Sequence, residues 1–239
     1  MRISFFEEFP SPNNLEKLDL LDSNPRVFLG AMSVSEFQRL SSDYPESDFV
    51  YWPILDRNDG YWVSPFSRRR ALLNLFESLK GKRIPVMLDM ELPRRRPMLL
   101  TQMFDAFANH SSIDDFIANY KGEVYTAEYL FEPFFMPFMY KDPRVHNNNV
   151  IKMVYTSMHN YDKEKLSNRL KEYATKYGPK FLVGLGTIAP GIIGTEPKLS
   201  PEDLDTDLEM CRDAGVEEVV IFRLGGLNKR YADVIKKFT

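Results

Sequence analysis

The sequence predicts an α/β protein, a single (β/α)8 TIM barrel domain spanning residues 1–239. Strand-length apolar runs alternate with helical segments from end to end, and this alternation is typical of parallel βαβ units. Eight such runs in 239 residues fit a compact closed barrel. No Gly-x-Gly-x-x-Gly follows the first run, which disfavours the alternative of a doubly wound nucleotide-binding sheet.

The expected strands are apolar runs bounded by turn residues, and they cover 3–9, 26–31, 48–55, 84–92, 123–131, 151–158, 180–188 and 218–224. The expected helices cover 15–21, 33–40, 67–79, 97–108, 113–120, 162–177, 200–214 and 228–238. Local signals support several of these bounds. Ser33 and Glu36 have capping-box spacing, Ser200 precedes Pro201, and Gly178-Pro179 ends a helix.

The fifth connection, 132–149, is predicted to be irregular. It contains Pro133, Pro137, Pro143 and the polar tract Asn147-Asn148-Asn149. Proline inside a helix removes a hydrogen bond and clashes with the preceding turn. We therefore expect a long, partly structured loop after the fifth strand.

The composition and the N-terminal sequence argue against several classes of protein. The net charge is −3, which argues against a nucleic-acid partner, and Cys211 is the only cysteine, which excludes an intramolecular disulfide. No apolar run is long enough to span a bilayer, and acids at Glu7 and Glu8 interrupt the N-terminus too early for a signal peptide. We expect a cytoplasmic protein without a membrane partner.

No cofactor is expected, because no sequence signature calls for one. The three histidines, His110, His146 and His159, lie in separate segments without metal-ligand spacing. We therefore also expect no metal site.

The run at 84–93 is the most informative feature for function. It is an apolar strand that ends in Asp89-Met90-Glu91, and residues two apart on a strand share a face. Two carboxylates side by side repel each other and add nothing to packing. In a barrel this end of the strand faces the active site, so catalysis is the favoured explanation.

Other strand ends carry side chains suited to a carbohydrate site. Acids supply proton transfer, aromatic rings stack on sugar faces, and charged groups bind hydroxyls. The candidate catalytic residues are Glu91, Asp89, Glu128 and Glu7, and the candidate substrate-binding residues are Trp52, Tyr61, Trp62, Tyr155 and Arg223.

The Asp-x-Glu ending of the fourth strand resembles the chitinase-like hydrolases of glycoside hydrolase family 18. That resemblance implies that Glu91 is the general acid, that Asp89 assists it, and that Tyr155 contacts the substrate. The family's earlier acidic positions fall on Val86 and neighbouring apolar residues. The resemblance implies a glycoside hydrolase-like enzyme acting on a carbohydrate or glycan fragment.

Two other functions stay open. Glycines after the seventh and eighth strands, with Arg223, suit the phosphate of a phosphosugar isomerase, aldolase or lyase. Alternatively, the barrel binds a sugar or a protein without catalysis. The apolar loop 132–140 would then cover the barrel mouth or form a homo-oligomer interface.

The candidate acids also have structural interpretations. Asp89 and Glu91 have possible ion-pair partners in Arg94-Arg95-Arg96, and Glu7 or Glu8 has one in Arg223 or Arg2.

Overall fold

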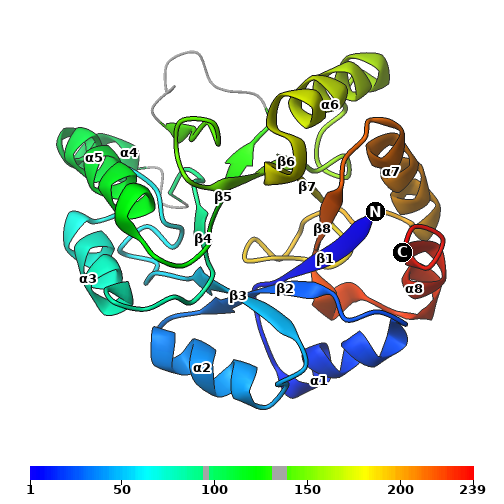
Figure 1. Cartoon of the computed structure of the whole chain (residues 1–239), viewed down its shortest axis with the longest axis horizontal. Coiled ribbons are helices and arrows are strands. Elements are labelled where there is room, and N and C mark those ends of the chain that lie inside the picture. Colours follow the sequence, from blue (N-terminus) through cyan, green and yellow to red (C-terminus); the bar gives the residue numbers. More distant parts are fainter. Residues whose placement is uncertain (94–96, 131–138) are drawn as a thin grey trace. The chain divides into compact units, whose positions relative to one another are not determined.

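The computed structural model describes residues 1–93, 97–130 and 139–239 of the chain. Within these residues, eight parallel strands in sequence order form a closed barrel (Figure 1), which confirms the predicted (β/α)8 fold class. The strands are β1 (Arg2–Glu7), β2 (Arg26–Ala31), β3 (Asp48–Pro53), β4 (Val86–Asp89), β5 (Val124–Tyr129), β6 (Asn149–Val154), β7 (Phe181–Gly186) and β8 (Glu218–Phe222).

Helices follow the strands, as expected. The α-helices are α1 (Pro12–Leu15), α2 (Val34–Ser42), α3 (Arg69–Leu79), α4 (Met98–Thr101), α5 (Met103–Asn119), α6 (Lys163–Tyr177), α7 (Pro201–Asp213) and α8 (Lys229–Ile235). Short 3-10 helices are η1 (Glu16–Leu20), η3 (Gly178–Lys180) and η4 (Leu224–Gly226). Ser200 caps α7 just before Pro201, as expected, and forms a capping box with Asp203.

The structure differs from the prediction in two helical regions. The helix expected at 15–21 is the single turn α1 followed by η1, because Ser11 caps the chain and Pro12 starts the helix earlier. The two helices expected at 97–108 and 113–120 are instead the short α4 and the continuous α5. Within α5, the Asn109 amide donates to the carbonyls of Pro65 and Ser67, both at 2.8 Å, which anchors a stretch with weak helix formers.

The irregular fifth connection is only partly described. Residues 139–148 contain no α-helix, as expected, while 131–138 lie outside the described residues. No helix in the described ranges combines the length and apolar character needed to cross a bilayer.

Internal contacts group the residues into two compact units. Unit 1 comprises Met1–Leu29, Tyr44–Phe49 and Ile151–Thr239, and unit 2 comprises Gly30–Asp43 and Val50–Val150. In Figure 1, α6 and α7 lie outside β6, β7 and β8 in unit 1, and α3 and α5 lie outside β4 and β5 in unit 2. The single domain spanning 1–239 stays a prediction.

Side-chain alternation assigns each strand residue of unit 2 to one of two faces. Tyr51 of β3 packs on Phe37 of α2, with ring centroids 5.2 Å apart, so Tyr51 is on the helix side. The register pairs Tyr51 with Val86 and Asp89 with Ala127. Paired residues in parallel strands share a face, so Asp89 is on the face turned away from the helices.

The same alternation separates Glu7 from Glu8 in unit 1. Phe6 packs against Phe28 and Phe222, at 5.5 Å and 6.1 Å between ring centroids. Glu7, one residue later, contacts Asn14 of α1. Glu7 therefore lies on the helix side of β1, and Glu8 follows Phe6 on the opposite side.

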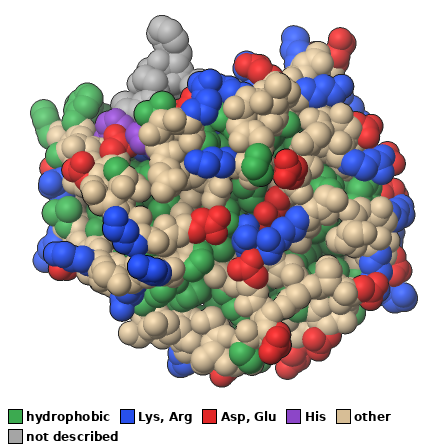
Figure 2. All heavy atoms as spheres, in the orientation of Figure 1, with side chains coloured by type: hydrophobic (Ala, Val, Ile, Leu, Met, Phe, Trp, Pro, Cys, Tyr) green, Lys and Arg blue, Asp and Glu red, His purple; other side chains and the backbone are tan. Residues whose placement is uncertain are grey.

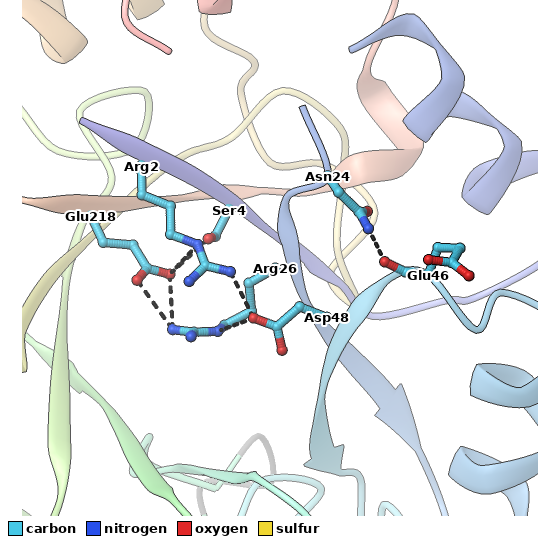
Figure 3. Close-up of polar contacts among 7 residues, drawn as sticks. All are labelled: Arg2, Ser4, Asn24, Arg26, Glu46, Asp48 and Glu218. Atoms are coloured by element: carbon cyan, nitrogen blue, oxygen red, sulfur yellow. Dashed lines mark hydrogen bonds and ion pairs between the residues drawn. The ribbon is translucent and has the colours of Figure 1, made fainter. Parts of the chain in front are cut away.

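A charged network joins the N-terminal ends of four strands in unit 1 (Figure 3). Arg26 lies between Glu218, at 3.1 Å, and Asp48, at 3.0 Å, and Arg2 reaches Asp48 at 2.6 Å. The Ser4 hydroxyl also donates to Glu218, at 2.7 Å. Polar contacts at this end of a barrel serve stability, because the chemistry occurs at the opposite end.

Candidate functional site

The carboxyl end of β4 is held by a tyrosine on the neighbouring strand. Asp89 is the last residue of β4 and is buried, while Glu91 follows two residues later and is partly exposed. The hydroxyl of Tyr129, at the end of β5, donates to Oε2 of Glu91 at 3.3 Å and accepts from the amide of Leu92, also at 3.3 Å. The Tyr129 side chain thereby positions both the Glu91 carboxylate and the backbone at Leu92.

The electrostatics of this group link all three residues. Burial raises the pKa of Tyr129, and the charges of Glu91 and Asp89 raise it further. The tyrosine therefore keeps its proton and acts as a neutral donor. Glu91 is thus a partly exposed carboxyl that accepts from a fixed donor, and the buried carboxyl of Asp89 is two residues away in the sequence. A general acid and an assisting residue can have this arrangement.

Tyr129 was not among the residues predicted from the sequence. The two-residue period of β5 contains the signal, because Tyr125, Ala127 and Tyr129 share one face. The register places Ala127 beside Asp89, and that pairing identifies the face. The register between β4 and β5 cannot be predicted from the sequence alone, so the sequence does not identify Tyr129 as a site residue.

Glu128 lies on the opposite face of β5. It is 1% exposed, and its Oε1 accepts from the Thr126 hydroxyl at 2.8 Å and the Lys141 amide at 2.9 Å. These bonds tie the strand to the connection that follows it. They favour a structural role for Glu128, and its catalytic role stays a prediction.

Of the three aromatic residues predicted from β3 and the loop after it, the structure places two in contact. Tyr61 and Trp62 make an edge-to-face contact with centroids 5.4 Å apart, whereas Trp52 is buried on β3. Tyr61 has a φ of 70°, rare for a bulky residue, and such conformations gather at functional sites. It lines an open cavity of about 600 Å³ together with Met32, Ile54 and Asp56.

In unit 1, Glu7 and Arg223 form the ion pair that the sequence offered as the structural interpretation. Arg223 Nη1 lies 2.9 Å from Glu7 Oε1, and Arg223 Nε donates to the Pro190 carbonyl. The Gly225 amide donates to Glu7 Oε2 at 2.6 Å. Burial raises the pKa of Glu7, while Arg223 and the amide donors oppose that rise. These contacts count against Glu7 as a catalytic acid and Arg223 as a free substrate ligand.

A second acid pair lies near Gly191 in unit 1, and the sequence did not reveal it. A Cβ on Gly191 would lie 2.9 Å from Oε2 of Glu8 and 3.1 Å from Oε1 of Glu196. The two carboxylates therefore approach the same point, where a side chain at position 191 would displace them. Tyr155 lies directly after β6, with its ring 6.0 Å from that of Phe222.

Two histidines that are far apart in the sequence meet in unit 2. The buried Lys141 ammonium contacts Asp114 at 2.5 Å and His110 Nδ1 at 2.7 Å, and His146 lies 3.8 Å from Asp114. Burial lowers the pKa of Lys141, and Asp114 opposes that shift. The described residues contain no group of three or more potential metal ligands with suitable geometry.

Some residues discussed for the site lie outside the described ranges. They are the triplet Arg94-Arg95-Arg96, offered as an ion-pair partner of Asp89 and Glu91, and most of the loop 132–140, offered as a lid or oligomer contact.

Comparison with known proteins identifies the fold. No protein-family model matches the chain, and neither does any curated protein sequence. Among solved structures, a family 18 chitinase from Pseudoalteromonas aurantia is similar, with a TM-score of 0.64 and 8% identity over 100% of both chains. The chain therefore has the same (β/α)8 barrel fold as this chitinase.

Two further structures share this barrel. The glycoside hydrolase domain of PgaB (BpsB) from Bordetella bronchiseptica has a TM-score of 0.57 and 11% identity, covering 98% of this chain and 97% of that one. A chitinase-like lectin from tamarind has a TM-score of 0.52 and 10% identity, covering 100% and 99%. At these identities the likeness establishes the fold, and function must be argued from the site.

Proposed function

We propose that this protein is a glycoside hydrolase-like enzyme that acts on a carbohydrate or glycan fragment by carboxylate acid/base catalysis. The observation that carries the proposal is the arrangement of Asp89, Glu91 and Tyr129 at the carboxyl ends of β4 and β5. In (β/α)8 barrels this end of the strands is where catalysis occurs. The solved structures with a similar fold include one named a chitinase and one named a glycoside hydrolase domain.

In this proposal Glu91 is the general acid that protonates the leaving glycosidic oxygen. Its partial exposure leaves it accessible to a substrate, and Tyr129 fixes its position. The buried Asp89 assists by placing a second negative charge nearby, which favours retention of a proton. Tyr61 lines the open cavity and contacts Trp62, and these two rings are proposed to stack on sugar rings.

The phosphosugar alternative is weakened by contacts in unit 1. Two of the groups expected to bind phosphate, the Arg223 guanidinium and the Gly225 amide, donate to Glu7 instead. Glu8 and Glu196 flank Gly191 in the loop after β7 and would repel an anion.

A sugar-binding barrel without catalysis remains a second candidate function. The tamarind chitinase-like lectin shows that a protein named for binding can share this fold. The two candidates differ in one respect, because a lectin retains its ligand unchanged whereas an enzyme turns it over.

The test is a screen of glycan substrates followed by substitution at the acid. Glu91→Gln should lower kcat by about 100-fold or more, because a general acid typically contributes 10²–10⁴ in rate. Glu77→Gln is the matched control, since Glu77 lies in the same unit and is 72% exposed. Full turnover by Glu91→Gln would exclude Glu91 as the general acid, and saturable sugar binding without turnover by the unsubstituted protein would favour the lectin.

A further inference from the structure

A cavity of about 880 Å³ opens between α6 and α7 in unit 1. Its lining comes from both helices, from residues 156–161 after β6, and from Lys198 and Leu199 before α7. Sites for small molecules typically have volumes of about 300–1,000 Å³. None of the residues proposed for glycoside hydrolysis lines this cavity, so it needs a separate explanation.

Opposite charges are balanced around the cavity. Figure 2, in the orientation of Figure 1, shows cationic and anionic side chains interspersed at the upper right, where α6 and α7 lie. The lining contains three lysines and three aspartates, which are Lys163, Lys171, Lys198, Asp203, Asp207 and Asp213. Because charges in a binding site are complementary to those of its ligand, a balanced lining favours a ligand that carries both signs.

Asp207 is the buried member of this set. It is 7% exposed, and its Oδ2 accepts a hydrogen bond from the Thr156 hydroxyl. Within the described residues its Oδ1 makes no hydrogen bond, and neither oxygen makes an ion pair. Since Asp207 lines the cavity, Oδ1 is available to a ligand there.

The other two aspartates of the lining have structural partners. Asp203 forms the capping box with Ser200, and Asp213 lies 3.4 Å from Nε of Arg212. For Asp207, burial raises the pKa from 3.8 to about 6, so the carboxyl is ionised at neutral pH. A buried carboxylate is costly unless a cation accompanies it. An acid kept at such a cost in a cavity indicates a binding role, and an ammonium group is the ligand group that best offsets the cost.

Two lysines near the start of the helices suit a negative group. Lys163 is the first residue of α6, and Lys198 lies shortly before α7 begins. Both are exposed, and neither makes an ion pair within the described ranges. The charge of Lys163 lowers the pKa of Asp207, which shows that the two side chains are near each other. One small molecule can therefore contact both.

Other ligand classes fit the lining less well. A neutral sugar would leave the buried charge of Asp207 without a cation, and a phosphate would be repelled by the aspartates. The part of the chain that the structure describes contains no group of three or more potential metal ligands with suitable geometry. An amino acid carries an ammonium group and a carboxylate on one carbon atom. Its side chain would contact the apolar part of the lining, at Leu166 and Met210.

We propose that the cavity between α6 and α7 binds a free amino acid, with its ammonium group on Asp207 and its carboxylate on Lys163 and Lys198. The proposal does not depend on the glycosidase assignment. Glu91→Gln should therefore bind the amino acid as the unsubstituted protein does.

The first test is thermal unfolding of the full chain with each standard L-amino acid at about 10 mM. A ligand that binds only the folded state, with a Kd of about 1 mM or tighter, raises the midpoint, and at least one amino acid should do so. Calorimetric titration then compares that amino acid with the 2-hydroxy acid and the amine of the same carbon skeleton.

The two analogues separate the two halves of the site. The hydroxy acid lacks the ammonium group and should bind about 30-fold more weakly, because a buried charge loses its partner. The amine lacks only contacts with exposed lysines and should bind about 3- to 10-fold more weakly. Equal binding by either analogue would overturn the proposal, as would the absence of a shift with every amino acid.

Substitution of the acid provides the second test. Asp207→Asn removes the charge but keeps an oxygen that accepts from Thr156, so the variant should fold and yet bind about 30-fold more weakly. Asp205→Asn is the matched control on the same helix, because Asp205 pairs with Lys237 and does not line the cavity. Unfolding midpoints without ligand verify that both variants fold. Unchanged affinity in Asp207→Asn would refute the proposal.

Discussion

The Tyr129 hydroxyl joins the carboxylate of Glu91, at 3.3 Å, to the backbone amide of Leu92, also at 3.3 Å. The tyrosine lies 38 residues from the acid in the sequence. Its ring comes from the face of β5 that is turned away from the helices. The position of the proposed general acid therefore depends on the pairing of β4 with β5 rather than on β4 alone.

Replacing Tyr129 by phenylalanine should therefore lower turnover. The change removes a hydrogen bond to Glu91, which is protonated when it acts as the general acid. Such a neutral bond is worth about 0.5–1.5 kcal/mol, which corresponds to a loss of about 2- to 10-fold in kcat. Steady-state kinetics on the substrate found by the glycan screen measure the effect. Tyr120→Phe is the control, because its hydroxyl also bonds in unit 2, to the carbonyl of Ile84 at 2.8 Å. Equal kinetics for both variants would contradict the positioning role.

The pair of Glu7 and Arg223 should be important for stability. Glu7 is 0% exposed, so Arg223→Met leaves a buried carboxylate without its cation. Breaking such a pair typically costs about 3–5 kcal/mol in the free energy of unfolding. The loss should be smaller at pH 5 than at pH 8, because burial already raises the pKa of Glu7 and a protonated acid needs no cation.

Chemical denaturation of the two single variants and the double variant separates this role from catalysis. Glu7→Gln combined with Arg223→Met should recover stability relative to Arg223→Met alone, with a coupling energy of about 1–3 kcal/mol. If Glu7 is instead a catalytic acid, Glu7→Gln will abolish turnover while leaving the unfolding midpoint unchanged.

The sequence predicts the eight strands well because each is an apolar run between turn residues, a local property of the chain. It also predicts that either Glu7 or Glu8 faces inward, since alternation is local as well. It does not indicate which of the two, because that depends on which face of β1 the helices cover. The contact of Glu7 with Asn14 of α1 decides the matter, because it shows that Glu7 lies on the helix side.

Other features of the site depend on contacts between distant segments. The continuity of α5 rests on Asn109, whose amide bonds lie 42 and 44 residues away in the sequence. The cluster of His110, Lys141 and His146 requires the connection after β5 to return to α5. Spacing along the sequence alone contains no signal for that approach, so the histidines appeared unrelated.

The cluster around Lys141 should make unit 2 sensitive to acid. Burial lowers the pKa of His110, the nearby Lys141 and His146 lower it further, and Asp114 opposes them. The unfolded chain therefore takes up a proton before the folded protein does, and stability falls as the pH drops below about 6.5. His110→Gln should lose less stability than the unsubstituted protein between pH 7.5 and 5.5.

Denaturation curves at the two pH values measure this difference. His159→Gln is the control, because His159 is exposed and lies in unit 1. An identical pH dependence for all three proteins would show that protonation of His110 does not cause the loss of stability in acid.

Asp207 on α7 should have the opposite effect, destabilising the protein at neutral pH. It is 7% exposed, accepts a hydrogen bond from the Thr156 hydroxyl, and lines an open cavity of about 880 Å³ between α6 and α7. Burial raises its pKa from 3.8 to about 6. The folded protein therefore binds this proton more tightly than the unfolded chain does. Stability rises as the pH falls through 6 towards 3.8, and above pH 6 the buried charge is a cost.

Asp207→Asn should therefore stabilise the protein at pH 7.5 by up to about 3 kcal/mol and have little effect near pH 4. The asparagine keeps an oxygen that accepts from Thr156 but carries no charge to desolvate. Urea denaturation at both pH values provides the measurement, with Asp233→Asn as the control because Asp233 is 56% exposed. Destabilisation by Asp207→Asn at pH 7.5 would mean that the charged carboxylate is better solvated in the cavity than its burial implies.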